Sequence, residues 1–278
     1  MTVTPAESAN WISVGALAES FASDDPSSNV LAPSPLLAGK TLALDGADGT
    51  EASYAFTSAS ELNWRIGAAA GTGRYLATSL RPGIFFVDFV RADRPSPASV
   101  SLVLDLNAGV ATQVLGEMPD AETAHGGLLS RAQRQQELTV VATQITAATI
   151  DRPFDPGAAL HRPTSELVGL RLQHRYNPHE VYEHIYLNAE RYGWHCLAGI
   201  EKGLGDVDRC HYLKIAPDLY LFVWREKIVP TLGVVMIDLE QLKTTGKIFG
   251  YAGDDLSTIS NFPVGAHSTI LNRTEHRL

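Results

Sequence analysis

The stretch 219–226 carries an acidic residue at the end of a row of aromatic residues. It reads LYLFVWRE and is typical of a β-strand, in which successive side chains point to opposite faces. One face therefore carries Tyr220, Phe222, Trp224 and Glu226. A carboxyl group held among aromatic rings loses hydration, which raises its pKa and suits it to general acid/base catalysis. The structural alternative is a strand-end glutamate that pairs with the neighbouring lysine or with a loop.

Histidine and tyrosine residues on two other strand-like stretches have the spacing to share that interior. His174 and Tyr176 lie on one strand face, where they offer an imidazole and a phenol to a polar ligand. A buried histidine satisfied by a neighbour is the alternative. In the stretch YEHIY, which begins at Tyr182, one orientation of the strand places Glu183 inside and the other places His184 inside. The pattern alone leaves both orientations open.

A last candidate, His195, follows a tryptophan and either lines the same cavity or has the structural role that we favour. We predict that the catalytic residues are Glu226, Tyr176 and His174. We predict that the substrate-binding residues are Tyr182, Glu183, His195, Tyr220, Phe222 and Trp224. The chain contains neither His-x-His nor Cys-x-x-Cys, the spacings typical of zinc sites, so no metal and no other cofactor is expected.

The elements that position these residues form a series of short strands. Runs rich in β-branched and aromatic residues alternate with Gly, Pro, Asn and Asp turn signals, a pattern typical of an all-β sandwich or barrel. The first runs are 37–45, 52–58, 61–67, 74–80, 84–91, 99–106 and 111–118. The segment 133–151 is expected to close this unit as one long strand or two paired strands. A Pro-rich connection then leads to a second series.

The second series repeats the first at a nearly constant spacing. The segment LAGK at 37–40 matches LVGL at 167–170, an offset of 130 residues, and later strands match at offsets of 133 to 135. We therefore predict an all-β fold of two tandem lipocalin-like antiparallel β-barrels with a short N-terminal helix. The predicted parts are an N-terminal extension (1–35), a first barrel (36–151), a linker (152–165) and a second barrel (166–278).

The two halves differ in chemistry although they match in pattern. Arg91 takes the place of Glu226 in the first barrel, whose inner row is expected to be Phe85, Val87, Phe89 and Arg91. Most histidines and tyrosines lie in the second half, so we place the site in the second barrel. The first barrel is then structural or a wall of the pocket.

The N-terminal extension contains a segment with helical spacing. One side of the predicted helix carries Trp11, Val14, Ala18 and Phe21. We expect this helix to dock on the apolar core, where it would cover one end of a barrel and help to close a cavity.

The composition excludes several classes of partner. The net charge of −9 argues against nucleic acid and anionic membranes, which both attract basic surfaces. The chain begins without a secretory signal pattern, has no apolar run long enough to span a membrane, and contains two cysteines. These features favour a cytoplasmic protein with free thiols. The oligomeric state stays open between a monomer and a homodimer.

Long stretches of the chain resemble the MoaF family. The C-terminal domain of that family is similar to YNPHEVYEHIYLNAERYGWHC, from Tyr176, and to LYLFVWREKIVPTLGVVMIDLE, from Leu219. Its N-terminal domain is similar to NWISVGALAESFASDD, from Asn10, and to LLAGKTLAL, from Leu36. The resemblance covers nearly the whole chain and implies the two-domain organisation described above.

The second half also resembles the bacterial phenolic acid decarboxylases, which have a lipocalin-like barrel. The matching segments are 169–176, 182–186, 192–195 and 220–226. The resemblance implies that Glu226 is a proton donor, that Tyr176 holds a substrate carboxylate and that Glu183 faces inward. His174 stands where the family has the first of its two tyrosines, and Tyr176 corresponds to the second. The family's arginine has no counterpart in the segment KGLG that begins at Lys202.

Taken together, the residues and the resemblances favour an enzyme. The predicted function is that of a cofactor-free lyase or isomerase, which acts by acid/base chemistry on a small aromatic or phenolic molecule inside the second barrel. A lipocalin-like protein that binds such a molecule without chemistry is the alternative. A scaffold for partner proteins is a third hypothesis, which a filled interior would favour.

Overall fold

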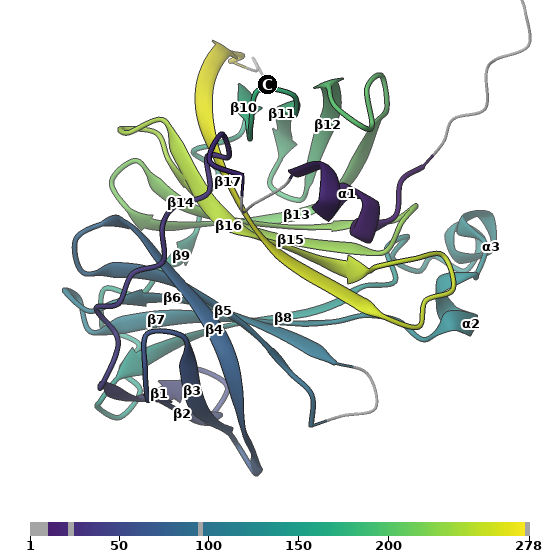
Figure 1. Cartoon of the computed structure of the whole chain (residues 1–278). Helices are drawn as coiled ribbons and strands as arrows, with labels where there is room; N and C mark the ends of the chain where they lie inside the picture. The colour runs from purple at the N-terminus through teal and green to yellow at the C-terminus, as the bar shows by residue number, and fades with distance from the viewer. Residues whose placement is uncertain (1–10, 22–24, 94–96, 276–278) are drawn as a thin grey trace, which may run out of the picture.

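The computed structural model contains two antiparallel β-barrels and describes residues 11–21, 25–93 and 97–275 (Figure 1). The first barrel closes because its first and last strands pair, with Leu44 opposite Ile150. Its strands are β1 (Thr41–Gly46), β2 (Glu51–Phe56), β3 (Glu61–Ile66), β4 (Ala69–Arg81), β5 (Ile84–Arg91), β6 (Ala98–Asp105), β7 (Val110–Glu117) and β8 (Ala142–Ile150).

The second barrel has the same strand order. It closes through β12 and β13, and a short strand of the linker, β9 (Arg162–Pro163), adds to the edge of β13. Its strands are β10 (Leu170–Arg175), β11 (Val181–Asn188), β12 (Arg191–Ala198), β13 (Gly205–Ala216), β14 (Leu219–Glu226), β15 (Thr231–Asp238), β16 (Lys243–Tyr251) and β17 (Ile259–Arg273). The all-β prediction of two antiparallel barrels is confirmed.

The closing segment of the first barrel differs from the prediction. A single strand, β8, closes the barrel, and the residues just before it are not a paired strand. Two short helices precede this strand, α2 (Ala121–Ala124) and α3 (Leu128–Gln133), which the strand pattern did not predict. The N-cap of α2 is Asp120, whose carboxylate accepts a hydrogen bond of 2.7 Å from the backbone N–H of Thr123.

The internal repeat is visible in equivalent turns. Gly39 and Gly169 both have a positive φ, 79° and 87°, a conformation that favours glycine. The N–H of Gly39 donates to the carbonyl of Phe56 at 2.7 Å, and the N–H of Gly169 donates to that of Tyr186 at 2.8 Å. A Cβ atom at Gly169 would lie 2.2 Å from the carbonyl oxygen of Thr274. The same backbone turn therefore starts both barrels.

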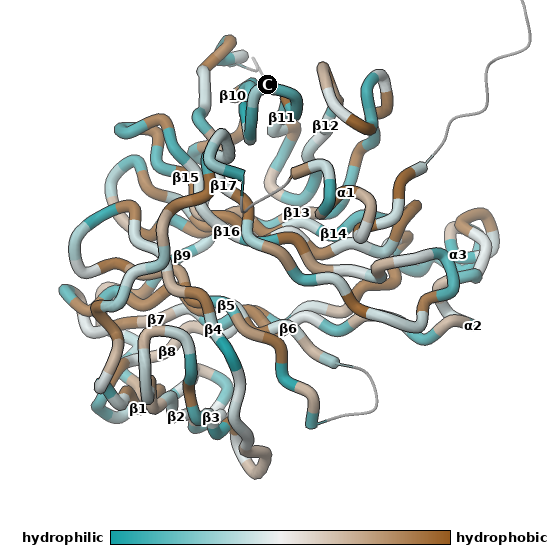
Figure 2. The backbone as a smooth tube through the Cα atoms, viewed as in Figure 1, coloured by the Kyte–Doolittle hydropathy of each residue, from teal (hydrophilic) through white to brown (hydrophobic). Residues whose placement is uncertain are grey.

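The barrels pack against each other through one face of each sheet. Figure 2 shows hydrophobic and polar residues mixed along the strands, and β1 alternates between buried and exposed residues. In contrast, every residue of β6 and of β15 is buried, because the other barrel covers their outer faces. The apolar contact is fixed at its edge by Arg81, which donates two hydrogen bonds of 2.7 and 3.0 Å to buried Asp238.

The N-terminal helix α1 (Val14–Phe21) docks on the second barrel (Figure 1). Its buried residues are Val14, Leu17 and Phe21, and it contacts β16 and β17. The predicted docking helix is therefore present, although Leu17 rather than Ala18 completes the buried stripe. Trp11 lies before the helix and packs edge-on against Trp194, with ring centroids 6.3 Å apart. In the part of the chain that the structure describes, no helix is long and apolar enough to cross a membrane.

Candidate functional site

The aromatic row on β14 faces the interior of the second barrel. Tyr220, Phe222 and Trp224 are buried in its apolar core, and the rings of Phe222 and Trp224 stack with centroids 5.1 Å apart. Glu226 ends the row, and its Oε1 accepts a hydrogen bond of 2.9 Å from the indole N–H of Trp224. A Cβ atom at Gly233 on the neighbouring strand would lie 2.1 Å from Trp224, so this glycine makes room for the indole.

The environment of Glu226 favours the protonated carboxyl. Burial raises its pKa well above the ordinary value, and the nearby carboxyl groups of Asp208 and Glu201 raise it further. The hydrogen bond from Trp224 acts in the opposite direction and is the weaker influence. Glu226 therefore keeps its proton to a higher pH than an exposed glutamate does, and this suits it to act as a general acid.

Two acidic residues near Glu226 were missed by the sequence reasoning. Glu201, in the turn after β12, is buried and its Oε2 accepts a hydrogen bond of 3.0 Å from the hydroxyl of Tyr182. Asp208, on β13, is buried and its Oδ2 accepts one of 3.0 Å from the indole N–H of Trp194. Burial raises the pKa of both carboxyl groups. Strand alternation places Asp208 on the inward face with Cys210, a signal that was available in the sequence.

The inward face of β10 and β11 carries two histidines side by side. The rings of His174 and His184 have centroids 4.6 Å apart, and both residues are buried. Nδ1 of His174 hydrogen-bonds to the hydroxyl of Ser268 at 2.9 Å, while its Nε2 and the Nδ1 of His184 have no hydrogen-bond partner among the described residues. Burial lowers the pKa of His174 to about 4 and that of His184 well below its ordinary value. Both imidazoles are therefore neutral at pH 7.

The orientation of β11 is opposite to the one that the resemblance favoured. His184 faces the lumen, where its ring contacts Tyr192, and Glu183 lies on the outer face. There the carboxylate of Glu183 accepts two hydrogen bonds from Arg171 of the neighbouring strand. Neighbouring side chains of a strand point to opposite faces. When Glu183 pairs with that arginine on the outer face, His184 therefore points inward. The expectation that Glu183 lines the cavity is corrected.

Three other predicted binding residues, His195, Tyr220 and Phe222, do not line the cavity. His195 is exposed on the outer face of β12, and its Nδ1 is 4.0 Å from a carboxylate oxygen of Glu183. Tyr220 points inward but lies elsewhere in the barrel, where its hydroxyl donates a hydrogen bond of 2.7 Å to Glu166. Phe222 belongs to the packed core and is not part of the cavity lining. The geometry therefore brings together Glu226, Tyr176, Tyr182 and Trp224 at the cavity, and the ring of His174 lies next to that of Tyr176.

The cavity in the second barrel is small and covered by α1. Its volume is about 30 Å³, which is room for about one water molecule. Leu17 and Phe21 of the helix form part of its wall. The full lining is Leu17, Phe21, Tyr176, Tyr182, His184, Tyr192, Trp194, Glu201, Trp224, Glu226 and Ile248. A larger ligand has to take the place of some of these side chains.

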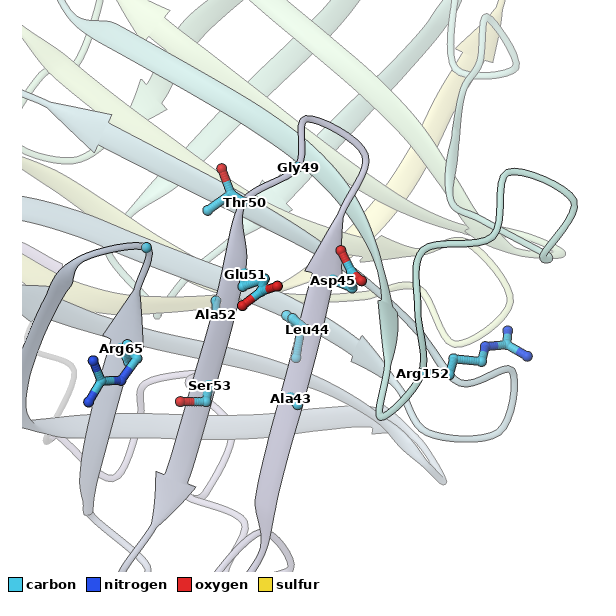
Figure 3. Close-up of a pocket in the computed structure, with 11 residues that line it drawn as sticks. Ala43, Leu44, Asp45, Gly49, Thr50, Glu51, Ala52, Ser53, Arg65 and Arg152 are labelled. Carbon is cyan, nitrogen blue, oxygen red and sulfur yellow. The ribbon is translucent and has the colours of Figure 1, made fainter.

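A wider groove, of about 630 Å³, lies on the first barrel, along β1 and β2 (Figure 3). Figure 3 shows the side chains of Arg65 and Arg152 directed to opposite sides of this groove. Its charged groups do not converge on one point, so it lacks the arrangement that a catalytic site requires. At the end of β5, Arg91 corresponds to Glu226 and donates hydrogen bonds of 2.7 and 2.6 Å to Asp93.

Comparisons with known proteins give a consistent result for the whole chain. The family model described as the MoaF N-terminal domain matches residues 9–120, and the MoaF C-terminal domain matches residues 161–274. The curated Protein MoaF of Klebsiella aerogenes is 46% identical over 267 residues, which cover 96% of this chain and 97% of that protein. These findings do not show the similarity to phenolic acid decarboxylases, which remains a prediction from the sequence.

Among solved structures, one match is the crystal structure of a putative beta-lactamase from Burkholderia vietnamiensis. It has a TM-score of 0.33 and 14% sequence identity, and the match covers 40% of this chain and 98% of that one.

Proposed function

The chain belongs to the MoaF family, and we propose that its second barrel is a cofactor-free acid/base site for a small aromatic molecule. The observation that carries this proposal is the carboxyl of Glu226, which is held among aromatic rings with a raised pKa at the wall of an internal cavity. A strand-end glutamate with a purely structural role would pair with a cation, whereas the hydrogen-bond donor to this one is an indole N–H.

The residues around the cavity have complementary roles in this proposal. Glu226 donates a proton to, or removes one from, a carbon atom of the ligand. Tyr176 lines the cavity and orients a polar group of the ligand, with His174 next to it, at a ring separation of 6.4 Å. His184 lines the same cavity, and its buried Nδ1, which has no hydrogen-bond partner among the described residues, can accept a hydrogen bond from the ligand. If the ligand only exchanges protons, the protein is an isomerase. If the ligand also loses a group, the protein is a lyase.

The ligand takes space that α1 occupies in the structure. Pockets for small organic molecules usually have volumes of about 300 Å³ or more. The cavity is about a tenth of that size, and Leu17 and Phe21 fill its helix side. Displacement of these two side chains opens the lumen beside Glu226 while the barrel strands keep their pairing. The helix thus controls access to the site.

The test is proton exchange at carbon. Candidate aromatic compounds are incubated with the protein in D₂O, and deuterium incorporation or product formation is followed by NMR and mass spectrometry. We expect turnover that is lost in Glu226→Gln, which keeps an acceptor for the Trp224 hydrogen bond but cannot transfer a proton. The control is Glu190→Gln, which changes an exposed carboxylate paired with Arg209. Full turnover in Glu226→Gln would refute the proposed role.

Binding without chemistry is the second candidate function, and the closed lumen favours it because turnover requires repeated access. In that case Glu226→Gln changes only the affinity, and a bound compound comes back unaltered. If no aromatic compound binds in the second barrel, the small volume of the cavity supports the scaffold hypothesis instead.

A further inference from the structure

The cavity of the second barrel is surrounded by acidic groups without a matching cation. Glu226 and Glu201 line it, and the carboxyl of Asp208 is close enough to raise the pKa of Glu226. Among the described residues that line the cavity there is no lysine and no arginine. An added positive charge favours ionisation of these carboxyl groups and an added negative charge opposes it, so the cavity suits a cation better than an anion.

Lys227, which lies near Asp208, is not part of the cavity lining. Nζ of Lys227 is 2.5 Å from Oδ1 of Asp206 and donates a hydrogen bond of 2.7 Å to the carbonyl of Val207. It lies 3.4 Å from Oδ1 of Asp208, so it offsets part of the charge at that carboxyl. One lysine shared between two aspartates leaves Glu226 and Glu201 without a cationic partner at the cavity.

A second observation points to a missing ligand atom. His184 lines the cavity and is 6% exposed, and its Nδ1 is buried without a hydrogen-bond partner among the described residues. A buried polar atom without a partner is uncommon, and it marks a place where a bound group supplies the missing hydrogen bond. Because this imidazole is neutral, its free nitrogen can accept a hydrogen bond from a donor on the ligand.

The walls of the cavity also suit a cation. Trp194 and Trp224 contribute indole rings, and Tyr182 and Tyr192 contribute phenol rings. The faces of such rings attract ammonium groups, most strongly where water is excluded. A flat aromatic body can pack among the same rings.

We propose that the second barrel selects a small aromatic ligand that carries a protonated amine, and that it rejects aromatic carboxylates. This inference rests on the proposed function, because it names the ligand class of the same site. The ammonium group lies between Glu226 and Glu201, and the ring packs in the space that Phe21 fills in the structure. It also departs from the decarboxylase resemblance, which implies a substrate with a carboxylate.

Binding of an ammonium group is linked to release of a proton. In the free protein Glu226 holds its proton because of burial, and an adjacent cation favours the ionised form. The proton passes to solvent, so affinity rises as the pH increases toward the raised pKa, as long as the amine stays protonated. The other titratable groups around Glu226 are Tyr176 just after β10, Tyr182 and His184 on β11, Tyr192 on β12, Glu201 in the following turn, Asp206 and Asp208 on β13, and Lys227 after β14.

The test compares three compounds of nearly the same size: benzylamine, benzyl alcohol and benzoate. Binding is measured by the fluorescence of the tryptophans that line the cavity and by calorimetry in buffers of different ionisation enthalpy, which reports proton release. We expect benzylamine to bind at least about tenfold more tightly than benzyl alcohol, because the hydrogen bond from its ammonium group to a carboxylate is charge-assisted. We expect no detectable binding of benzoate.

Two variants connect this preference to the cavity. Glu226→Gln should reduce the preference for the amine over the alcohol by about tenfold, and it should abolish proton release. Glu190→Gln, at an exposed ion pair of the same barrel, should leave the preference unchanged. The same measurements are repeated in Phe21→Ala, where the lumen has more room. Slow or blocked entry of the compounds into the wild-type cavity then does not hide the preference.

The outcomes separate the inference from the proposed function. If the alcohol or benzoate binds in the lumen as tightly as the amine, the inference fails while the site in the second barrel stands. An amine preference that Glu226→Gln leaves intact overturns it as well. If none of the three compounds binds to the wild-type protein or to Phe21→Ala, both the inference and the proposed function fail.

Discussion

Replacing Glu226 with glutamine should change the way in which stability depends on pH. Because the folded pKa of Glu226 is raised above the unfolded value of about 4.3, the folded state keeps a proton that the unfolded state releases. The stabilisation from this proton is complete below pH 4.3 and is lost as the pH rises toward the folded pKa. One proton corresponds to a slope of at most about 1.4 kcal/mol per pH unit over the range between the unfolded and the folded pKa.

The assay is urea unfolding of the wild-type protein and of Glu226→Gln at pH 5, 6 and 7, followed by tryptophan fluorescence. The difference in unfolding free energy between the two proteins reports Glu226 together with its coupling to Asp208 and Glu201. Titratable groups that do not interact with Glu226 are common to both proteins and cancel. We expect the variant to gain stability relative to the wild type by up to about 1.4 kcal/mol per pH unit.

A difference that stays constant between pH 5 and pH 7 would refute the reasoning, because it would mean that Glu226 titrates in the folded protein as it does in the unfolded chain. Glu190→Gln serves as the control, since its carboxylate is exposed and paired with Arg209. Its difference from the wild type should show no comparable slope.

Three further substitutions test the packing around the site and the contact between the barrels, each by urea unfolding. Phe21→Ala removes a buried ring from α1 and should cost about 3 kcal/mol or more, while it increases the uptake of small apolar ligands. Gly233→Ala brings a Cβ atom to 2.1 Å from Trp224 and should cost about 1–3 kcal/mol, with a change in tryptophan fluorescence. Arg81→Met leaves the buried carboxylate of Asp238 without its arginine and should cost about 3 kcal/mol.

Each of these predictions has a matched control. Glu19→Ala changes an exposed position of α1 and should leave ligand uptake unchanged. Gly73→Ala adds a Cβ atom whose nearest neighbour is 3.7 Å away and should be much milder than the change at Gly233. Glu240→Gln affects the exposed partner of Arg81 and should cost less than about 1 kcal/mol. Equal effects in a variant and its control would contradict the corresponding account.

The strands and the repeat could be predicted because their signals are local. Alternation of apolar residues, turn residues at regular intervals and the matching glycines Gly39 and Gly169 all lie within a few positions of the structure they determine. The helices α2 and α3 were missed, since helices of four and six residues are too short to show a helical period. Residues just before β8 were counted as strand because their composition alone resembles one.

The candidate site could be predicted only in part. The row that ends in Glu226 was found because one strand carries all of it. Glu201 was missed because it lies in a turn after β12, where no periodicity indicates which way a side chain points. His184 and Glu183 could not be distinguished, since an alternating strand fits two orientations that differ by one residue.

The sequence by itself determined two tandem antiparallel β-barrels, a docking helix and an acid at the end of an aromatic row, because each depends on neighbours in the chain. Tertiary structure decided which face of β11 points inward, through the pairing of Arg171 with Glu183 across strands. It also brought the carboxyls of Glu201 and Asp208 near Glu226, and their charge and shared burial raise its pKa. Charge and burial act through space, so groups separated along the chain acquire a joint chemistry only when the barrel closes.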